Sequence, residues 1–268
     1  MTDATKLGAE LVDLHEHPRE TAPFSTRYPG LTADQGYAAA RKLHEHRLAH
    51  GWKPVGRKIG FTNRTIWPRY GVHEPIWGFV YDRTLISSNQ NKAVIPLDGL
   101  VQPRIEPEIC FRLKARPPAT RDPSALLACI EWIAHSVEIV QCRHPGWKLN
   151  LADSTASNGL HGRLTHGTPV PIEKVSGLAA ALPFLKVDLF NGERRVDSGI
   201  GSNVLGSPLL ALSFLVELLE KQKDSPKLAA GEIISTGTIT DAHPVAPGET
   251  WRTDLHGFAT RNLEVRFA

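Results

Sequence analysis

The first clear helix signal in the sequence begins at Thr32. Gln35 follows three residues later, which is the spacing of a capping box, so we expect a helix from there to about His50. Gly51 then provides a C-terminal cap. Residues 1–30 are polar and interrupted by prolines, and they give no comparable signal. We therefore expect the N-terminal segment to be irregular up to that helix.

Two further helices are predicted where a capping residue precedes a proline. Asp122-Pro123 is such a pair, and the apolar residues after it keep helical spacing as far as Val137. Ser207-Pro208 repeats the signal before a strongly apolar helix over residues 209–220. The two pairs thus predict one amphipathic and one largely buried helix.

Alternating and β-branched segments predict strands. Residues 104–113 alternate glutamates with apolar residues, and Pro107 within them favours an edge position or a bulge. Shorter strands are predicted at 137–141, 232–236 and 263–267. Residues 56–85, which are rich in glycine and proline, indicate short strands and turns. An α+β fold with a mostly antiparallel β core fits this order best.

Length and composition limit the classes of protein that remain. The 268 residues allow one large or two small domains, and because no linker divides them we expect one domain, 1–268, with a helical and loop-rich part (1–85) and a β-rich core (86–268). The net charge of +3 comes from scattered basic residues, which argues against nucleic acid as a partner. The apolar stretch 209–219 is too short and too interrupted to span a membrane. The N-terminus lacks a secretory signal, so we expect a cytoplasmic location.

Cysteines and histidines give no strong metal signature. Cys110, Cys129 and Cys142 are far apart, and we interpret them as reduced packing residues. His46 and His50 share a helical face, but no cysteine or acid completes a zinc set. A nucleophile elbow and a dinucleotide fingerprint are also missing from the sequence.

Glu106 and Glu108 are the most informative acids. In a strand they leave the same face, roughly 6 to 7 Å apart at the backbone. Taken alone, the pair fits a solvated outer face better than a site in which a cation or a shared proton compensates the charge. All-oxygen ligands would select a hard ion such as Mg²⁺ or Mn²⁺.

An ordered series of motifs resembles one known family. The series runs from about Leu31 to the C-terminus and comprises GRKIGFT (56–62), QPRIEPEI (102–109), IEW (130–132), EIV (138–140), LGSPL (205–209) and GEIISTG (231–237). It is similar to the 2-keto-4-pentenoate hydratase and 4-oxalocrotonate decarboxylase family, which belongs to the fumarylacetoacetate hydrolase superfamily. The resemblance implies an antiparallel β-sandwich or roll with flanking helices.

The resemblance also implies a metal site. Its three ligands are Glu106, Glu108 and Glu138, and its ion is Mg²⁺ or Mn²⁺. A third acid on a neighbouring strand makes a cluster without a cation very costly, so the metal interpretation replaces the solvated face.

Further roles follow from the same resemblance. Lys58 is the candidate proton donor or carboxylate anchor, because burial beside a metal lowers the pKa of a lysine toward the working range. Asp82 is the candidate acid or base, with a simple turn residue as the alternative interpretation. Substrate contacts are expected from Arg57, Ser157, Asn158, His161 and Thr236.

The resemblance implies a hydratase that adds water to a 2-hydroxy-2,4-dienoate, giving a 4-hydroxy-2-oxo acid in the catabolism of aromatic or cyclic compounds. Ser157 stands where similar hydratases carry an acid, which favours a 4-oxalocrotonate-type decarboxylase as the alternative. His135, three residues before Glu138, is interpreted as a core histidine.

Two other readings remain. A C–C bond hydrolase of the superfamily needs a Glu-His pair, which His15-Glu16-His17 imitates. A non-catalytic partner subunit is opposed by the three intact glutamates. The resemblance also implies a homo-oligomer, with association to a pathway aldolase or decarboxylase.

Overall fold

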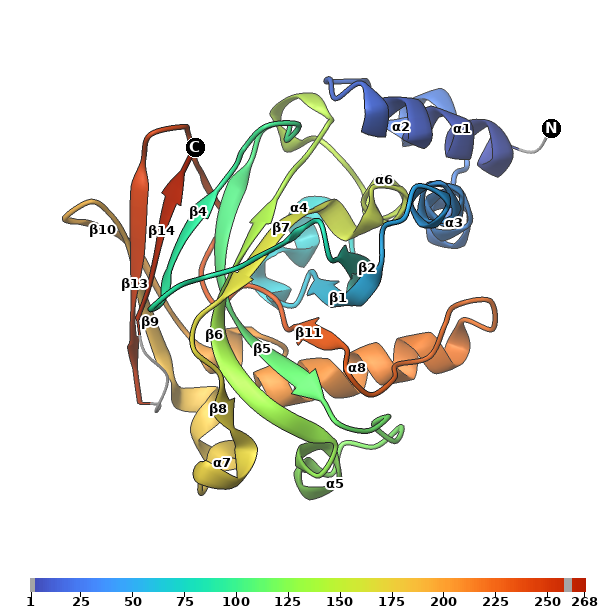
Figure 1. The fold of residues 1–268 in the computed structure, drawn as a ribbon. Helices are drawn as coiled ribbons and strands as arrows, with labels where there is room; N and C mark the ends of the chain where they lie inside the picture. Colours follow the sequence, from blue (N-terminus) through green and yellow to red (C-terminus); the bar gives the residue numbers. More distant parts are fainter. Residues whose placement is uncertain (1–2, 258–261) are drawn as a thin grey trace.

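Two β-sheets form the centre of the computed structural model, which describes residues 3–257 and 262–268 (Figure 1). In the described chain the larger sheet has nine strands, in the order β2 (Ile76–Tyr81), β1 (Pro54–Gly60), β11 (Ile233–Ser235), β5 (Arg104–Leu113), β6 (Ile130–Val140), β7 (His161–His166) and β3 (Leu85–Ile86), with β12 (His243–Pro244) paired to β5 and β8 (Val170–Pro171) paired to β6. The smaller sheet has the order β10 (Arg194–Ile200), β9 (Lys186–Asn191), β13 (Thr250–His256), β14 (Leu263–Phe267) and β4 (Lys92–Ile95).

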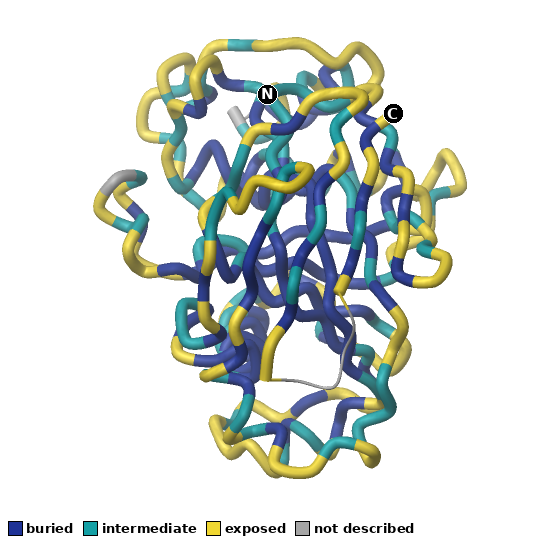
Figure 2. The backbone as a smooth tube through the Cα atoms, turned by 90° about the vertical axis from the view of Figure 1, so that its left-hand side faces the viewer, coloured by how far each residue is buried: buried dark blue, intermediate teal, exposed yellow. Residues whose placement is uncertain are grey.

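Most strand pairs are antiparallel. The parallel pairs among the described strands are β1 with β11, β14 with β4, and β3 with β7. The two sheets pack face to face through one apolar core, to which Ile105, Val137 and Ile139 contribute from the larger sheet and Trp251 and Phe267 from the smaller one. Figure 2 shows buried residues along the strands and exposed residues in the loops that connect them. The prediction of an α+β fold with an antiparallel sandwich-like core is confirmed.

Helices flank the sheets. The α-helices are α1 (Asp3–Glu16), α2 (Phe24–Arg27), α3 (Ala33–Ala49), α4 (Trp67–Tyr70), α5 (Pro123–Leu127), α6 (Leu151–Ala156), α7 (Leu178–Ala181) and α8 (Pro208–Lys221). The short 3-10 helices are η1 (Arg64–Ile66), η2 (Pro145–Trp147), η3 (Asn158–Leu160), η4 (Ile172–Lys174), η5 (Leu182–Phe184) and η6 (Gly201–Asn203). The capping box of Thr32 and Gln35 begins α3 as predicted.

The apolar helix α8 belongs to the protein core. Residues 201–221, which include α8, are the one described stretch long and apolar enough, by length and composition alone, to cross a membrane. Leu212 and Leu215 are fully buried and pack with Phe111 and Ile133 of the larger sheet. We therefore interpret α8 as a core helix.

The predicted helix over residues 122–137 is wrong. α5 ends at Leu127 and the long strand β6 begins at Ile130, where it pairs with β5 along its whole length. Residues 133–140 are buried on both faces of the sheet, so their apolar residues do not alternate with polar ones. Because that alternation is missing, the spacing of the apolar residues from Leu126 to Val137 also fits one face of a helix, which explains the wrong prediction.

Two smaller expectations also need correction. The N-terminal segment is helical over α1, whose Leu7, Leu11 and Leu14 pack into a core with α3. Strand β5 is not an edge strand. Pro107 lies where its neighbour changes from β11 to β12, and its carbonyl accepts a hydrogen bond from the backbone N–H of Ile239.

Candidate active site and metal centre

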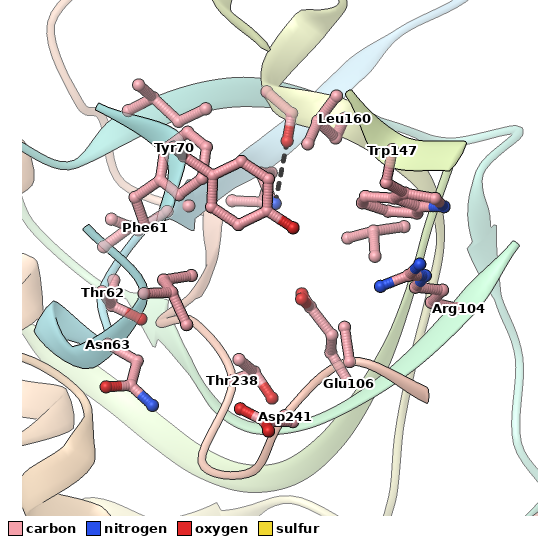
Figure 3. A pocket seen from close by; sticks show the side chains of 18 of the residues that line it. Phe61, Thr62, Asn63, Tyr70, Arg104, Glu106, Trp147, Leu160, Thr238 and Asp241 are labelled. Atoms are coloured by element: carbon pink, nitrogen blue, oxygen red, sulfur yellow. Dashed lines mark hydrogen bonds between the residues drawn. The ribbon is translucent and has the colours of Figure 1, made fainter. Parts of the chain in front are cut away.

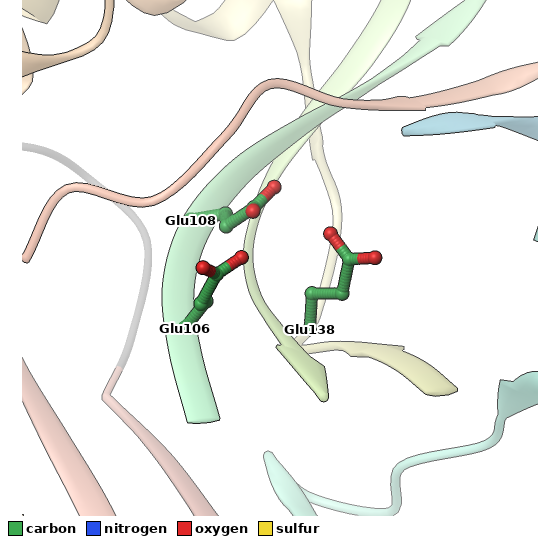
Figure 4. A group of neighbouring side chains, drawn as sticks. All are labelled: Glu106, Glu108 and Glu138. Carbon is green, nitrogen blue, oxygen red and sulfur yellow. The ribbon is translucent and has the colours of Figure 1, made fainter. Parts of the chain in front are cut away.

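The register between β5 and β6 brings the three predicted glutamates together. Glu106 lies directly opposite Glu138, and Glu108 leaves the same face of β5 two residues further on. Each offers a carboxylate oxygen, and these three atoms lie within 4.8 Å of one another. Figure 4 shows the three carboxylates converging on one space. Within the described residues this is the one cluster of potential metal ligands.

Glu108 is held by donors that follow strand β11. The hydroxyl of Ser235 donates to Oε2 of Glu108 at 2.6 Å, and the backbone N–H of Gly237 donates to the same oxygen at 2.8 Å. Gly237 has a φ of 102°, and a Cβ there would lie 1.9 Å from Oγ1 of Thr62. A glycine is therefore needed to turn this N–H toward the carboxylate. The other oxygen of Glu108, Oε1, is buried and has no hydrogen-bond partner.

Glu138 is positioned by His161 and Lys58. Nδ1 of His161 lies 2.8 Å from Oε1 of Glu138, and Nε2 of the same ring lies 2.8 Å from the hydroxyl of Thr84. Burial lowers the pKa of His161, although Glu138 opposes this shift. The ring thus links the carboxylate of Glu138 to Thr84, whose hydroxyl also donates to the carbonyl of Tyr81. Nζ of Lys58 lies 3.4 Å from Oε2 of Glu138, which is buried and lacks a hydrogen-bond partner.

The three carboxylates outnumber the one buried ammonium near them, that of Lys58. Burial, reinforced by the charge of Glu138, raises the pKa of Glu106 to about 7, and burial with repulsion from the other two glutamates raises that of Glu108 well above its usual value. Burial would also raise the pKa of Glu138. The effects of Lys58 and His161 outweigh that of burial, so the pKa of Glu138 is lowered. Among the protein groups alone, the three carboxylates outweigh the burial of Lys58 and raise its pKa. The lowering expected of a lysine beside a metal stays a prediction, because it depends on the charge of the ion.

The donor set fits a hard divalent cation. Oε1 of Glu108 and Oε2 of Glu138 are orphaned in that they accept no hydrogen bond, although Oε2 of Glu138 lies 3.4 Å from Nζ of Lys58. Buried carboxylates are normally hydrogen-bonded, paired or bound to a metal. Oxygen-only ligands suit Mg²⁺ or Mn²⁺. Glu106, Glu108 and Glu138 would hold the ion.

A pocket of about 240 Å³ opens beside the cluster, and Lys58 and Glu106 line it. Figure 3 shows Glu106, Arg104 and Trp147 on one side of the cavity, with Phe61 and Tyr70 across from them. The other lining residues are Ile59, Gly60, Thr62, Asn63, Ile66, Ile76, Val140, Leu149, Gly159, Leu160, Thr238, Thr240, Asp241, Ala242 and His243. Nζ of Lys58 donates to the carbonyl of Gly159 at 2.9 Å, which fixes the ammonium in the pocket wall. The pocket thus combines a charged end with an apolar wall, as a small organic acid requires.

Several predicted site residues lie around this pocket rather than in it. Arg57 leaves the other face of β1, where it pairs with Glu232 at 2.7 Å and stacks on Phe79. Asn158 bonds both the N–H and the carbonyl of Phe79 and thereby ties η3 to β2. The hydroxyl of Thr236 donates to the carbonyl of Ile109.

Two more predicted residues are further from the cluster. Asp82 is exposed in the turn after β2, and its carboxylate accepts from the backbone N–H groups of Lys53 and Arg83. This is the geometry of a turn residue, and the structure does not bring Asp82 into the pocket. Ser157 lines a separate small cavity. The carboxylate of the nearby acid Asp153 accepts from the backbone N–H of Asn150 in the capping box that begins α6.

His135, the histidines of residues 15–17 and the cysteines lie outside the substrate pocket. His135 is 1% exposed and bonds the carbonyl of Glu108 and the hydroxyl of Thr253, as expected for a core histidine. The three cysteines are free and buried. The segment 15–17 lies at the end of α1 and does not line the pocket, so it offers no Glu-His pair to a substrate there.

Sequence reasoning missed the residues that support the ligands and shape the pocket. Ser235 and Gly237 belong to the motif GEIISTG that carried the resemblance, but only the register of β11 against β5 shows that they face Glu108. Arg104 lies two residues before Glu106 in the motif QPRIEPEI, so a strand places both side chains on one face, and it could have been proposed from that spacing.

Comparisons with known proteins show which family the chain belongs to. No model of a known protein family matches the chain. The 2-hydroxyhexa-2,4-dienoate hydratase of Comamonas testosteroni is 31% identical over 266 residues, which cover 96% of this chain and 95% of the relative. A 4-oxalocrotonate decarboxylase of Pseudomonas sp. (strain CF600) is 31% identical over 264 residues, covering 97% and 92%. The chain belongs to the 2-keto-4-pentenoate hydratase and 4-oxalocrotonate decarboxylase family.

Solved structures extend the comparison to the fold of this family. The 4-oxalocrotonate decarboxylase from Pseudomonas putida G7, complexed with magnesium and adipate, matches with a TM-score of 0.89 and 26% identity, over 100% of this chain and 99% of that one. Fumarylpyruvate hydrolase from Pseudomonas aeruginosa, in complex with Mn²⁺ and pyruvate, matches with a TM-score of 0.59 and 12% identity, over 79% and 88%. The latter likeness, at 12% identity, shows a shared fold.

Proposed function

We propose that this protein is a divalent-metal-dependent lyase that adds water to a 2-hydroxy-2,4-dienoate and forms a 4-hydroxy-2-oxo acid. One observation carries the proposal: three glutamates with two orphaned buried oxygens stand at the edge of a pocket sized for a small acid, in a chain similar over nearly its whole length to a dienoate hydratase. When bound, a hard cation supplies electrophilic stabilisation of negative charge that develops on the 2-oxygen of the substrate.

Lys58 is the residue to which we assign proton transfer or carboxylate binding. Its ammonium lies in the pocket wall, 3.4 Å from Glu138, and is held by the carbonyl of Gly159. It can therefore reach a substrate beside the ligands without leaving its position. Asp82 takes no part in this proposal, because its carboxylate serves the turn after β2.

Decarboxylation of a 4-oxalocrotonate-type dicarboxylate is the second candidate. Arg104 lines the pocket on the side of Glu106 and offers a second cation besides Lys58. The decarboxylase that this structure resembles at a TM-score of 0.89 holds adipate, which is itself a dicarboxylate. Decarboxylation also needs no activated water. This suits the pocket, because Asp82, the candidate acid or base predicted from the sequence, does not line it.

The two reactions are distinguished by incubating the protein with Mg²⁺ and, separately, 2-hydroxypenta-2,4-dienoate or 4-oxalocrotonate. Loss of the conjugated absorbance of the dienoate without release of CO₂ supports hydration. Release of CO₂ from oxalocrotonate supports decarboxylation. Silence with both substrates, in protein that binds the metal, would overturn both assignments.

The organisation of the chain in the cell is a further part of the proposal. We propose one catalytic domain, because residues from both parts of the chain line the same pocket: residues between 58 and 76 from the N-terminal part, and residues between 104 and 243 from the β-rich core.

The family resemblance supports a homo-oligomer in the cytoplasm. It also supports a role in the catabolism of aromatic or cyclic compounds and association with a pathway aldolase or decarboxylase. Light scattering of the purified protein tests the oligomer, and a monomer at micromolar concentration would contradict it.

A further inference from the structure

A second, smaller cavity is lined by His161, the residue that bonds the carboxylate of Glu138. Its volume is about 30 Å³, and it shares no lining residue with the substrate pocket. Its wall is formed by Leu11, Leu43, Arg47, Gln141, Arg143, Ala156, Ser157, Asn158 and His161. Helices α1 and α3 therefore meet the segments around η3 at this cavity.

Three hydrogen-bond donors of the wall have no acceptor. Arg47 is only 8% exposed, and its Nε has no partner. Nη1 of Arg143 and the hydroxyl of Ser157 are also buried without a partner. Buried polar groups are nearly always hydrogen-bonded, so three orphaned donors in one wall indicate a missing acceptor.

The charge of the two guanidinium groups is also uncompensated. Among the described residues neither forms an ion pair with a carboxylate; Glu16 pairs instead with His46, and Glu138 with His161. The centre of the Trp52 ring lies 5.0 Å from the guanidinium of Arg47. This contact helps to fix the position of the guanidinium but does not neutralise its charge. Burial, reinforced by Arg47, lowers the pKa of Arg143 to about 10, the direction expected of a cation without a counterion.

We propose that this cavity binds a small inorganic anion of the size of chloride, with Arg47, Arg143 and Ser157 as its donors. A cavity of about 10–15 Å³ holds one water molecule, so this volume admits a monatomic ion and excludes a substrate acid. The anion accepts from all three orphaned donors and neutralises the guanidinium pair. It thereby ties α3, through Arg47, to Arg143 and to the segment from Ser157 to His161, the residue that orients Glu138.

Thermal unfolding tests the site with chloride as the probe. We expect Tm to rise by about 3 °C, and to saturate, when chloride replaces gluconate at constant ionic strength. This is the rise expected when a ligand that binds only the native state is present at a concentration of about ten times its Kd. Arg143→Gln should remove this rise. Arg116→Gln is the matched control, because Arg116 is exposed and pairs with Glu220, so it should keep the rise. A Tm independent of chloride in the unsubstituted protein, or an equal rise in Arg143→Gln, would overturn the proposal.

Two further measurements keep the test independent of whether Arg143→Gln folds. Ser157→Asp places a carboxylate among the guanidinium groups, so we expect a higher Tm than the unsubstituted protein in gluconate and no response to chloride; a lower Tm with an intact chloride response would contradict the site. Crystals soaked in bromide should show an anomalous peak between Arg47 and Arg143. Ordered water without an anomalous signal at that position would refute anion binding.

Discussion

Replacing Ser235 by alanine tests how the metal centre is supported. The hydroxyl of Ser235 donates to Glu108 at 2.6 Å, and only the N–H of Gly237 would remain on that oxygen. A hydrogen bond to a charged group contributes about 1.5–3 kcal/mol, and each 1.4 kcal/mol is a factor of ten in affinity. We therefore expect Ser235→Ala to weaken Mn²⁺ binding by about 10- to 100-fold, as is typical for residues that orient metal ligands.

Isothermal titration with Mn²⁺ measures this change directly, and Thr236→Val provides the matched control. Thr236 is the next residue and equally buried, but its hydroxyl donates to the carbonyl of Ile109 and not to a ligand. We expect that variant to bind Mn²⁺ within about twofold of the unsubstituted protein. Equal affinities of Ser235→Ala and the unsubstituted protein would refute the role of Glu108 as a ligand held by Ser235.

Three further predictions concern Lys58, Gly237 and Asp82. Lys58→Met should lower kcat by about 100-fold in steady-state assays, while Mn²⁺ titration shows affinity at least as high as before, because a competing cation near the ligands is lost. Gly237→Ala should lower the free energy of unfolding by about 1–3 kcal/mol in denaturant titrations, since φ is 102° and the new Cβ would contact Thr62. Asp82→Ala should keep activity within about twofold, because its carboxylate only caps a turn; a tenfold loss would restore it as a catalytic candidate.

The β-core could be predicted where burial is one-sided. Strand β14 matches the predicted range, residues 263–267, because its residues alternate between the core and the surface. Strand β6 was missed as a long strand because both of its faces are buried from Ile133 to Val140, which removes the alternation. Helix α1 does carry a signal in the spacing of Leu7, Leu11 and Leu14, but the polar residues and prolines around it obscured the pattern.

The ligands could be predicted more fully than their surroundings. Glu106 and Glu108 share a face by the geometry of any strand, and the resemblance supplied Glu138. The partners of Glu108 come from residues 127 and 129 positions away, so they depend on how β11 pairs with β5. The resemblance places Arg57 in the site together with Lys58, yet neighbouring residues of a strand point to opposite faces, and Arg57 stacks on Phe79 instead.

The most direct test of the metal centre is the anomalous signal of Mn²⁺ in crystals of this protein. The structure predicts one peak between the carboxylates of Glu106, Glu108 and Glu138, within about 2.0–2.6 Å of an oxygen of each. The same crystals of Glu108→Gln should show a much weaker peak. Mn²⁺ bound elsewhere, or no peak between the three carboxylates at saturating Mn²⁺, would contradict the assignment of these glutamates as the metal site.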